Sequence, residues 1–130
     1  MVLFIITLRL FYNRSKYTDM LYLFNSQIIP VNWQLADSYI IKIKKIDVDQ
    51  ARQLVIQNQF ISAIGHDSTA KLLSMLLNID IPINRIQIQM NSGDIGLHFT
   101  LKKRLDEGQV IKNVHELEEI GFDLLMSEVL

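Results

Sequence analysis

Residues 65–77 read GHDSTAKLLSMLL. Its apolar side chains recur at helical spacing, at Ala70, Leu73, Leu76 and Leu77. The pattern predicts an amphipathic helix over 68–77, with Asp67 as N-cap and Gly65 allowing a sharp turn before it. A helix of this kind needs an apolar surface to cover, so the neighbouring segments are expected to supply a sheet.

The segments upstream supply two strands and a second helix. Residues 21–24 are a short apolar strand candidate, and residues 38–45 alternate between apolar and polar side chains. Such alternation is typical of a strand with one face on a core and one face in water. Residues 47–58 predict a helix that starts at Asp47 as N-cap.

Two more alternating segments follow downstream. Residues 86–90 and 95–101 flank Asn-Ser-Gly-Asp, and we interpret them as a β-hairpin. Residues 102–113 are rich in charge and predict a loop, followed by a short helix and a last strand over 120–126. The order of elements predicts one α/β domain with a mixed sheet of about five strands flanked by helices.

The chain starts with an apolar run, Met1–Phe11, that is shorter than the roughly 20 residues of a membrane-spanning helix. We expect residues 1–19 to form an extension outside the domain, which then spans residues 20–130. An upstream start codon, with Met20 as the natural first residue, is an alternative interpretation. We expect no membrane association and a cytoplasmic location, the host cytoplasm for a viral protein.

Composition excludes several classes of function. The net charge is −1, which argues against long nucleic acid as a ligand, because phosphate neutralisation requires a basic excess. The chain has no cysteine, so disulfides and thiolate chemistry are excluded. Its three histidines lack metal-ligand spacing, so we expect neither a metal site nor another cofactor.

The segment 64–69, Ile-Gly-His-Asp-Ser-Thr, combines residues that suit phosphate chemistry. A helix N-terminus presents unpaired N–H groups to an anion, and the Ser68 and Thr69 hydroxyls add donors. His66 beside a bound phosphate could transfer a proton near neutral pH. From these residues alone, an ordinary helix start with a surface histidine is the favoured interpretation, because short motifs have high false-positive rates.

Two arginines are further candidates for phosphate binding. Arg104 follows strand 95–101, on its polar face if the pleat continues, in a loop that ends at Gly108. Arg85 opens the other strand of the expected hairpin. Taken singly, both positions are more typical of solvated surface residues. His98, on the same polar face, has no evident partner and is expected to be structural or exposed.

The combination of segments resembles a known family. Residues 21–26, 64–69, 84–86 and 104–108 match, in order and spacing, the viral anti-CRISPR ring nucleases that act on type III CRISPR signalling. The resemblance covers residues 20–126, and the His-centred segment 64–69 is its most specific part. The chain departs from the family at Thr100, in the loop after Asn25 and in the extension 1–19.

The resemblance implies a function and roles for residues. It implies a homodimeric ring nuclease that cuts cyclic tetra-adenylate, without a metal, into linear di-adenylate ending in a 2′,3′-cyclic phosphate. His66 is then the expected general acid, and Glu107 its partner in a loop that closes over the ligand. The expected ligand-binding residues are Arg104, Arg85, Asn25, Ser68 and Thr69.

Two other classes of function remain open from the sequence. One is a dimer that binds and sequesters the cyclic nucleotide without cutting it. The other is a small regulatory or structural viral protein, although the net charge of −1 and the absence of a basic helix argue against DNA binding.

Overall fold

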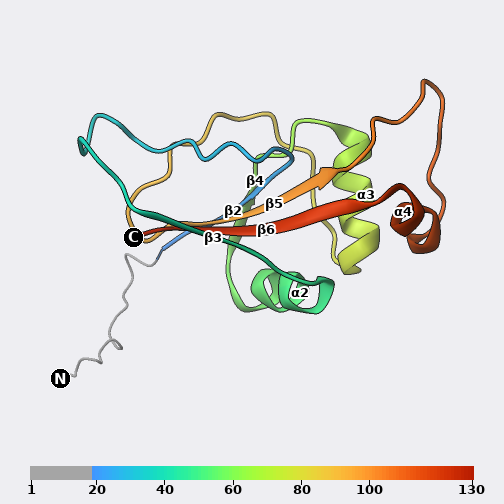
Figure 1. The fold of residues 1–130 in the computed structure, drawn as a ribbon, viewed down its shortest axis with the longest axis horizontal. Helices are drawn as coiled ribbons and strands as arrows, with labels where there is room; N and C mark the ends of the chain where they lie inside the picture. The colour runs from blue at the N-terminus through green and yellow to red at the C-terminus, as the bar shows by residue number, and fades with distance from the viewer. Residues whose placement is uncertain (1–18) are drawn as a thin grey trace.

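Five strands form one mixed sheet in the part of the chain that the structure, a computed structural model, describes, residues 19–130 (Figure 1). The order across the sheet is β3-β6-β5-β2-β4. The strands are β2 (Leu21–Phe24), β3 (Ile41–Lys45), β4 (Phe60–Ser62), β5 (Ile95–Leu101) and β6 (Phe122–Val129). β2 runs parallel to β4 and β5, whereas β6 runs antiparallel to β5 and β3. The predicted mixed five-stranded α/β fold is therefore confirmed.

Within residues 19–130, three helices supply the apolar cover that the sequence pattern predicts. They are α2 (Val48–Gln57), α3 (Asp67–Leu77) and α4 (Val114–Ile120). Asp47 caps α2 as predicted, and with Gln50 it forms a reciprocal capping box. Leu73 and Leu77 of α3 are fully buried and share the main core with Leu23 and Leu97 of the sheet. One face of the sheet is thus closed by helices.

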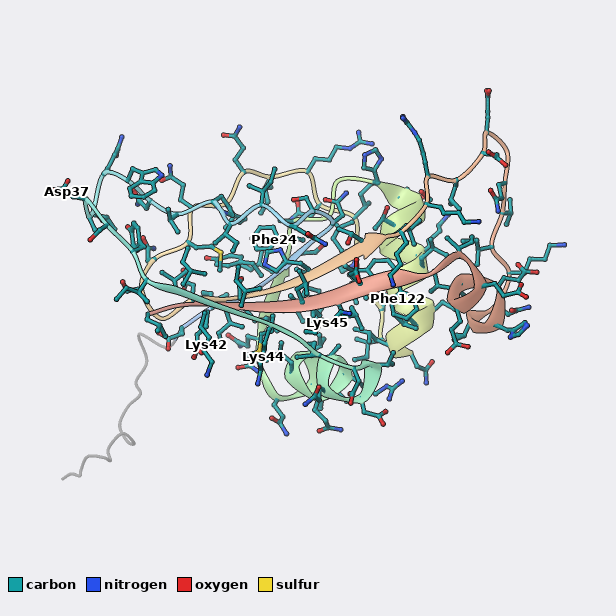
Figure 2. All side chains as sticks on the ribbon, viewed as in Figure 1. Phe24, Asp37, Lys42, Lys44, Lys45 and Phe122 are labelled. Atoms are coloured by element: carbon teal, nitrogen blue, oxygen red, sulfur yellow. The ribbon has the colours of Figure 1, made fainter. Side chains whose placement is uncertain are left out.

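Irregular segments cover the opposite face of the sheet (Figure 1). A second core cluster lies there, made by Phe24, Val31, Met90 and Val129. In Figure 2, Phe24 lies on the side of the sheet where the chain after β2 and the chain before β5 cross it. The chain after β2 and the chain before β5 therefore rest on this face.

The edges of the sheet differ in character. β3 forms one edge and carries Lys42, Lys44 and Lys45, all exposed (Figure 2). Charged side chains along an edge strand discourage pairing with another strand. β4 forms the other edge, has only three residues and was not predicted, because so short a run shows no clear period.

The hairpin expected from residues 86–90 and 95–101 is wrong. β5 pairs with β2 on one side and β6 on the other, so neither of its edges is open to residues 86–90. That segment instead crosses the sheet face, where Met90 exchanges backbone hydrogen bonds with the chain after β2 and forms an isolated bridge to Val31. Its alternation reflects the packing of Ile88 and Met90 against the second core cluster, and such burial needs no strand.

The start of the described chain is fixed by a buried carboxylate. Asp94 is 7% exposed and accepts hydrogen bonds from the backbone N–H groups of Met20 (3.1 Å) and Asn91 (2.8 Å). The extension expected over residues 1–19 lies outside the described residues except for Asp19. Within residues 19–130, no helix has the length and apolar character needed to span a membrane.

Candidate functional site

β2 and β4 are parallel, so the segments that follow them leave the sheet at the same end, next to the carboxyl ends of both strands. Ala63, just after β4, donates its backbone N–H to the Leu23 carbonyl at 2.8 Å. The chain then leads through Gly65 to α3, while β2 leads into Asn25. Loops at the carboxyl ends of parallel strands are common ligand sites. Asn25 and His66, 41 positions apart in sequence, therefore border one site.

His66 itself, not Asp67, is the N-cap of α3, which corrects the prediction. Its backbone is extended (φ −110°, ψ 123°), and its carbonyl accepts from Ala70 at 3.0 Å. Asp67 already has helical geometry, and its carboxylate pairs with Lys71 at 2.9 Å. The imidazole of His66 makes no capping hydrogen bond and is exposed. The ring is therefore free to meet a ligand at the helix N-terminus.

Arg85 is held next to His66 by the backbone. Asn84 donates its backbone N–H to the Ile64 carbonyl and its side-chain amide to the Ser62 carbonyl, both at 2.8 Å. Arg85 then donates Nε–H to the Gly65 carbonyl at 2.8 Å. Among residues 19–130, no carboxylate pairs with Arg85, so its terminal nitrogens can bind an anion.

These residues line one open hollow of about 400 Å³. The lining residues are Asn25, Ala63, Gly65, His66, Arg85, Ile86 and Gln87. A second hollow of about 520 Å³ continues from it and shares Asn25, Ala63, Ile86 and Gln87. The second hollow adds apolar side chains, among them Ile28, Val31 and Ile88. A polar end with a histidine and an arginine thus adjoins a more apolar end.

Two predicted ligand residues stand close to this hollow without lining it. Ser68 is exposed and Thr69 is partly buried, both in the first turn of α3 directly after His66. Ile86 and Gln87 line the hollow but were not among the predicted residues. Their position directly after Arg85 was the signal that could have identified them.

The loop after β5 is not part of the hollow. β5 ends at Leu101, so the pleat does not extend to Arg104. Arg104 and Glu107 are exposed in residues 102–113, which stand beyond the end of β5 and lead into α4 (Figure 1). Leu105 and Ile111 of this loop pack against the main core. The described residues contain no cluster of three or more histidine, aspartate or glutamate side chains suited to a metal ion.

His98 is buried and structural, which is one of the two expected outcomes, and it has two hydrogen-bond partners that the sequence did not reveal. It is 2% exposed; its Nδ1 lies 2.8 Å from the Ser26 carbonyl and its Nε2 lies 2.8 Å from the Ser127 hydroxyl. Because a carbonyl only accepts, Nδ1 carries the proton, and the neutral ring accepts from Ser127. Burial lowers the pKa of His98, and the hydrogen bond to Ser26 opposes this in part.

This lowered pKa predicts a pH-dependent stability. The unfolded chain protonates His98 near pH 6.5, whereas the folded chain does so only at lower pH. The contribution of neutral His98 is therefore complete above about pH 6.5 and is lost as the pH falls through its folded pKa. The loss cannot exceed about 1.4 kcal/mol per pH unit for one proton.

Urea unfolding between pH 7 and pH 5 measures this effect. The slope of unfolding free energy against pH should flatten in His98→Asn and persist in His115→Ala, which removes an exposed histidine on α4. Equal slopes in all three proteins would contradict the role given to His98.

Comparison with known proteins finds relatives of this chain in viruses. The family model described as STIV B116-like matches residues 21–124. Uncharacterized protein 26 of Sulfolobus islandicus filamentous virus is 44% identical over 110 residues, covering 85% of this chain and 92% of that protein. Uncharacterized protein ORF117 of Acidianus two-tailed virus is 42% identical over 106 residues, covering 80% and 88%.

A solved structure agrees. B116 of Sulfolobus turreted icosahedral virus superposes with a TM-score of 0.70 at 26% identity, covering 84% of this chain and 98% of that one. The family match over residues 21–124 includes β2 to β5, the N-terminus of α3 and the loop after β5. The chain therefore belongs to the STIV B116-like family, a family of viral proteins.

Proposed function

We propose that this protein is a ring nuclease that cuts cyclic tetra-adenylate into linear di-adenylate ending in a 2′,3′-cyclic phosphate. The observation that carries the proposal is the shared hollow of His66, Arg85 and Asn25 at the N-terminus of α3. It offers N–H groups and a guanidinium for a phosphate, together with a histidine that has no other hydrogen bond at the cap.

Cleavage of the ring requires few protein groups, because the ribose 2′-oxygen of the ligand is itself the nucleophile. The ribose 2′-oxygen attacks its own phosphorus, the bond from phosphorus to the 5′-oxygen breaks, and the 2′-hydroxyl proton leaves to solvent. His66 donates a proton to the departing 5′-oxygen, while Arg85 stabilises the charge that develops on the phosphate oxygens. Holding the nucleophile in line can supply roughly 7–11 kcal/mol of barrier reduction.

The size of the ligand favours a homodimer. Pockets of roughly 300–1,000 Å³ enclose drug-sized molecules, whereas this ring contains four nucleotides. One protomer's open hollow of about 400 Å³ thus covers part of the ring, and two equivalent hollows related by a two-fold axis suit its symmetry.

Exposed apolar side chains support the same assembly. Four of them, each at least 64% exposed, lie on the segment that crosses the site-bearing face: Ile28, Trp33, Leu35 and Ile40. A second copy docked beside the hollows would bury such residues. We expect light scattering to give twice the chain mass and calorimetry to give one ring per dimer; a stable monomer binding one ring per chain would refute the dimer.

In a cell, this cleavage would remove the messenger that activates effectors of type III CRISPR immunity. The protein would then act as an anti-CRISPR in the cytoplasm of the host. Ser68, Thr69 and Arg104 would add ligand contacts, and Glu107 would join the site from the loop after β5.

The decisive experiment incubates the protein with radiolabelled cyclic tetra-adenylate in excess chelator and identifies products by chromatography. Linear di-adenylate with a cyclic phosphate is expected. Binding without products would favour a sequestering protein, and neither binding nor products would favour a regulatory or structural viral role. Cyclic tri- and hexa-adenylate in parallel reactions report the preferred ring size.

A further inference from the structure

We infer that His98 is a positioning residue for the proposed site, holding Asn25 beside His66 through the Ser26 carbonyl. The inference rests on the proposed function for its ligand, but its structural basis is independent of the reaction. It concerns a buried polar side chain on β5 that the proposed chemistry does not use.

Three contacts hold the imidazole: one ring stack and two hydrogen bonds. It stacks on Phe24 with ring centroids 5.0 Å apart and planes 19° from parallel. Its two nitrogens bond Ser26 and Ser127, each at 2.8 Å. β2, β5 and β6 each contribute to this arrangement, so the ring has one orientation.

The space beside Gly96 is filled by the side chains of His98 and Ser127. A Cβ atom at residue 96 would lie 2.6 Å from the Ser127 hydroxyl oxygen and 2.8 Å from Nε2 of His98. Both distances are shorter than real Cβ contacts, so a side chain at residue 96 would displace the imidazole. Glycine therefore leaves room for the His98–Ser127 contact.

The loop after β2 is held mainly by the hydrogen bond from His98 to the Ser26 carbonyl, because its other side-chain hydrogen bonds are weaker. Gln27 reaches the Thr100 hydroxyl at 3.3 Å, and the Ile28 N–H reaches the Ser26 hydroxyl at 3.4 Å. Both of these bonds are long and exposed to competing water. The bond from His98 to the Ser26 carbonyl is short and comes from a buried donor, so it is the main anchor of residues 25–28.

The anchored loop forms part of the site. Asn25 lines both hollows, and Ser26 lines the larger one. Moving the Ser26 carbonyl would move Asn25 relative to His66 and Arg85, which are held from β4 and the chain after it. We therefore expect loss of the anchor to weaken ligand binding while leaving the core on the helix face intact.

Two substitutions separate this role from simple packing. In His98→Asn, the amide nitrogen falls near the position of Nδ1 and can still donate to the Ser26 carbonyl. In His98→Gln, the amide nitrogen falls nearer the position of Nε2 and reaches Ser127 instead. Ser127→Ala is the matched control, since it removes the other hydrogen bond and keeps the anchor.

The first measurement is the affinity of each variant for cyclic tetra-adenylate, made in a His66→Ala background so that the ring is not cleaved. The second is the NMR chemical shift of the backbone amides of residues 25–28 in the free protein. Loss of one hydrogen bond should weaken binding about 3- to 12-fold in the Gln variant and shift these amides. The Asn and Ser127→Ala variants should bind within about 2-fold of the parent. Thermal unfolding of each variant shows whether it is folded.

The outcomes discriminate between the two proposals. Unshifted loop amides and unchanged affinity in the Gln variant would overturn the positioning role. Equal weakening in the Asn, Gln and Ser127→Ala variants, in step with lost stability, would also overturn it and leave a packing residue. If the unsubstituted protein binds no ring at all, the proposed function fails, and the amide shifts still decide whether His98 holds the loop.

Discussion

Replacing His66 by alanine is expected to lower the single-turnover rate of ring cleavage by about 10²–10⁴-fold and to leave binding of the ring largely intact. The imidazole is the group placed to protonate the leaving oxygen, at the N-cap of α3 and beside Arg85. The helix N–H groups and the guanidinium remain in the variant, so the phosphate keeps its main contacts. The change also removes little buried surface, because His66 is exposed.

Rapid-quench measurement at saturating enzyme gives the chemical step, and calorimetry gives the affinity. His115→Ala is a matched control, because His115 is also exposed and pairs only with Glu119 on α4 at 3.6 Å. The control should cleave at the native rate. A His66→Ala protein that turns over normally would remove the general acid from the mechanism.

The sequence predicts elements best where the relevant contacts are local. Asp47 followed by Gln50 specifies the start of α2, and the leucines of 65–77 specify the buried face of α3. At the start of α3, by contrast, residue preference favours Asp67 as the cap, because aspartate is a common N-cap residue. The Lys71 side chain, one turn on, pairs with Asp67 in the structure, and the cap position shifts to His66.

Non-local pairing explains the strand errors. Residues 86–90 alternate as a strand does, but which segment pairs with β5 depends on β2 and β6, from distant parts of the chain. β4 is only three residues long and gains its place from β2. The periodicity of a local segment shows neither which strands pair with β5 nor that β4 pairs with β2.

The site was predicted in part. Asn25, His66 and Arg85 come together in the structure, although Arg85 was expected to open a strand that does not form. The partners of His98 were not predicted, because a backbone carbonyl and a serine on β6 cannot be identified as its neighbours from the local sequence. The burial of His98 can be predicted only once the strand order, which places β5 between β2 and β6, is known.

The placement of the loop after β5 sets a geometric requirement for the proposed mechanism. Glu107 and Arg104 are exposed and line neither hollow, so a role at His66 requires the loop either to move within one protomer or to reach the hollow of a second copy. Among residues 19–130, neither side chain has an ion-pair partner that would hold it in its present position. Gly108 has a positive φ of 78° with open space around it, so the turn can be retained while the loop shifts.

Glu107→Ala is expected to slow the chemical step by about 10²-fold or more, if the carboxylate orients the reacting ribose or His66. Binding should not weaken, because removing a negative charge near a polyanion removes repulsion. Arg104→Ala, from the same loop, is the contrasting variant: it should weaken binding by about 10- to 100-fold through loss of a charge-assisted phosphate contact and affect the rate at saturation less. If the Glu107→Ala variant cleaved the ring at the native rate, Glu107 would have no part in the chemical step, and the loop would only cover the ligand.

Mixing two inactive variants distinguishes the two ways in which Glu107 could reach the site. In a mixed dimer of His66→Ala and Glu107→Ala protomers, a site that takes both residues from one protomer is never complete. A site that takes His66 from one protomer and Glu107 from its partner is complete once per dimer. Because the loop lines neither hollow of its own protomer, we expect activity to return on mixing, toward half the native rate per mixed dimer. Activity that stays absent, with subunit exchange verified by mass spectrometry, would mean that the loop closes over the hollow of its own chain.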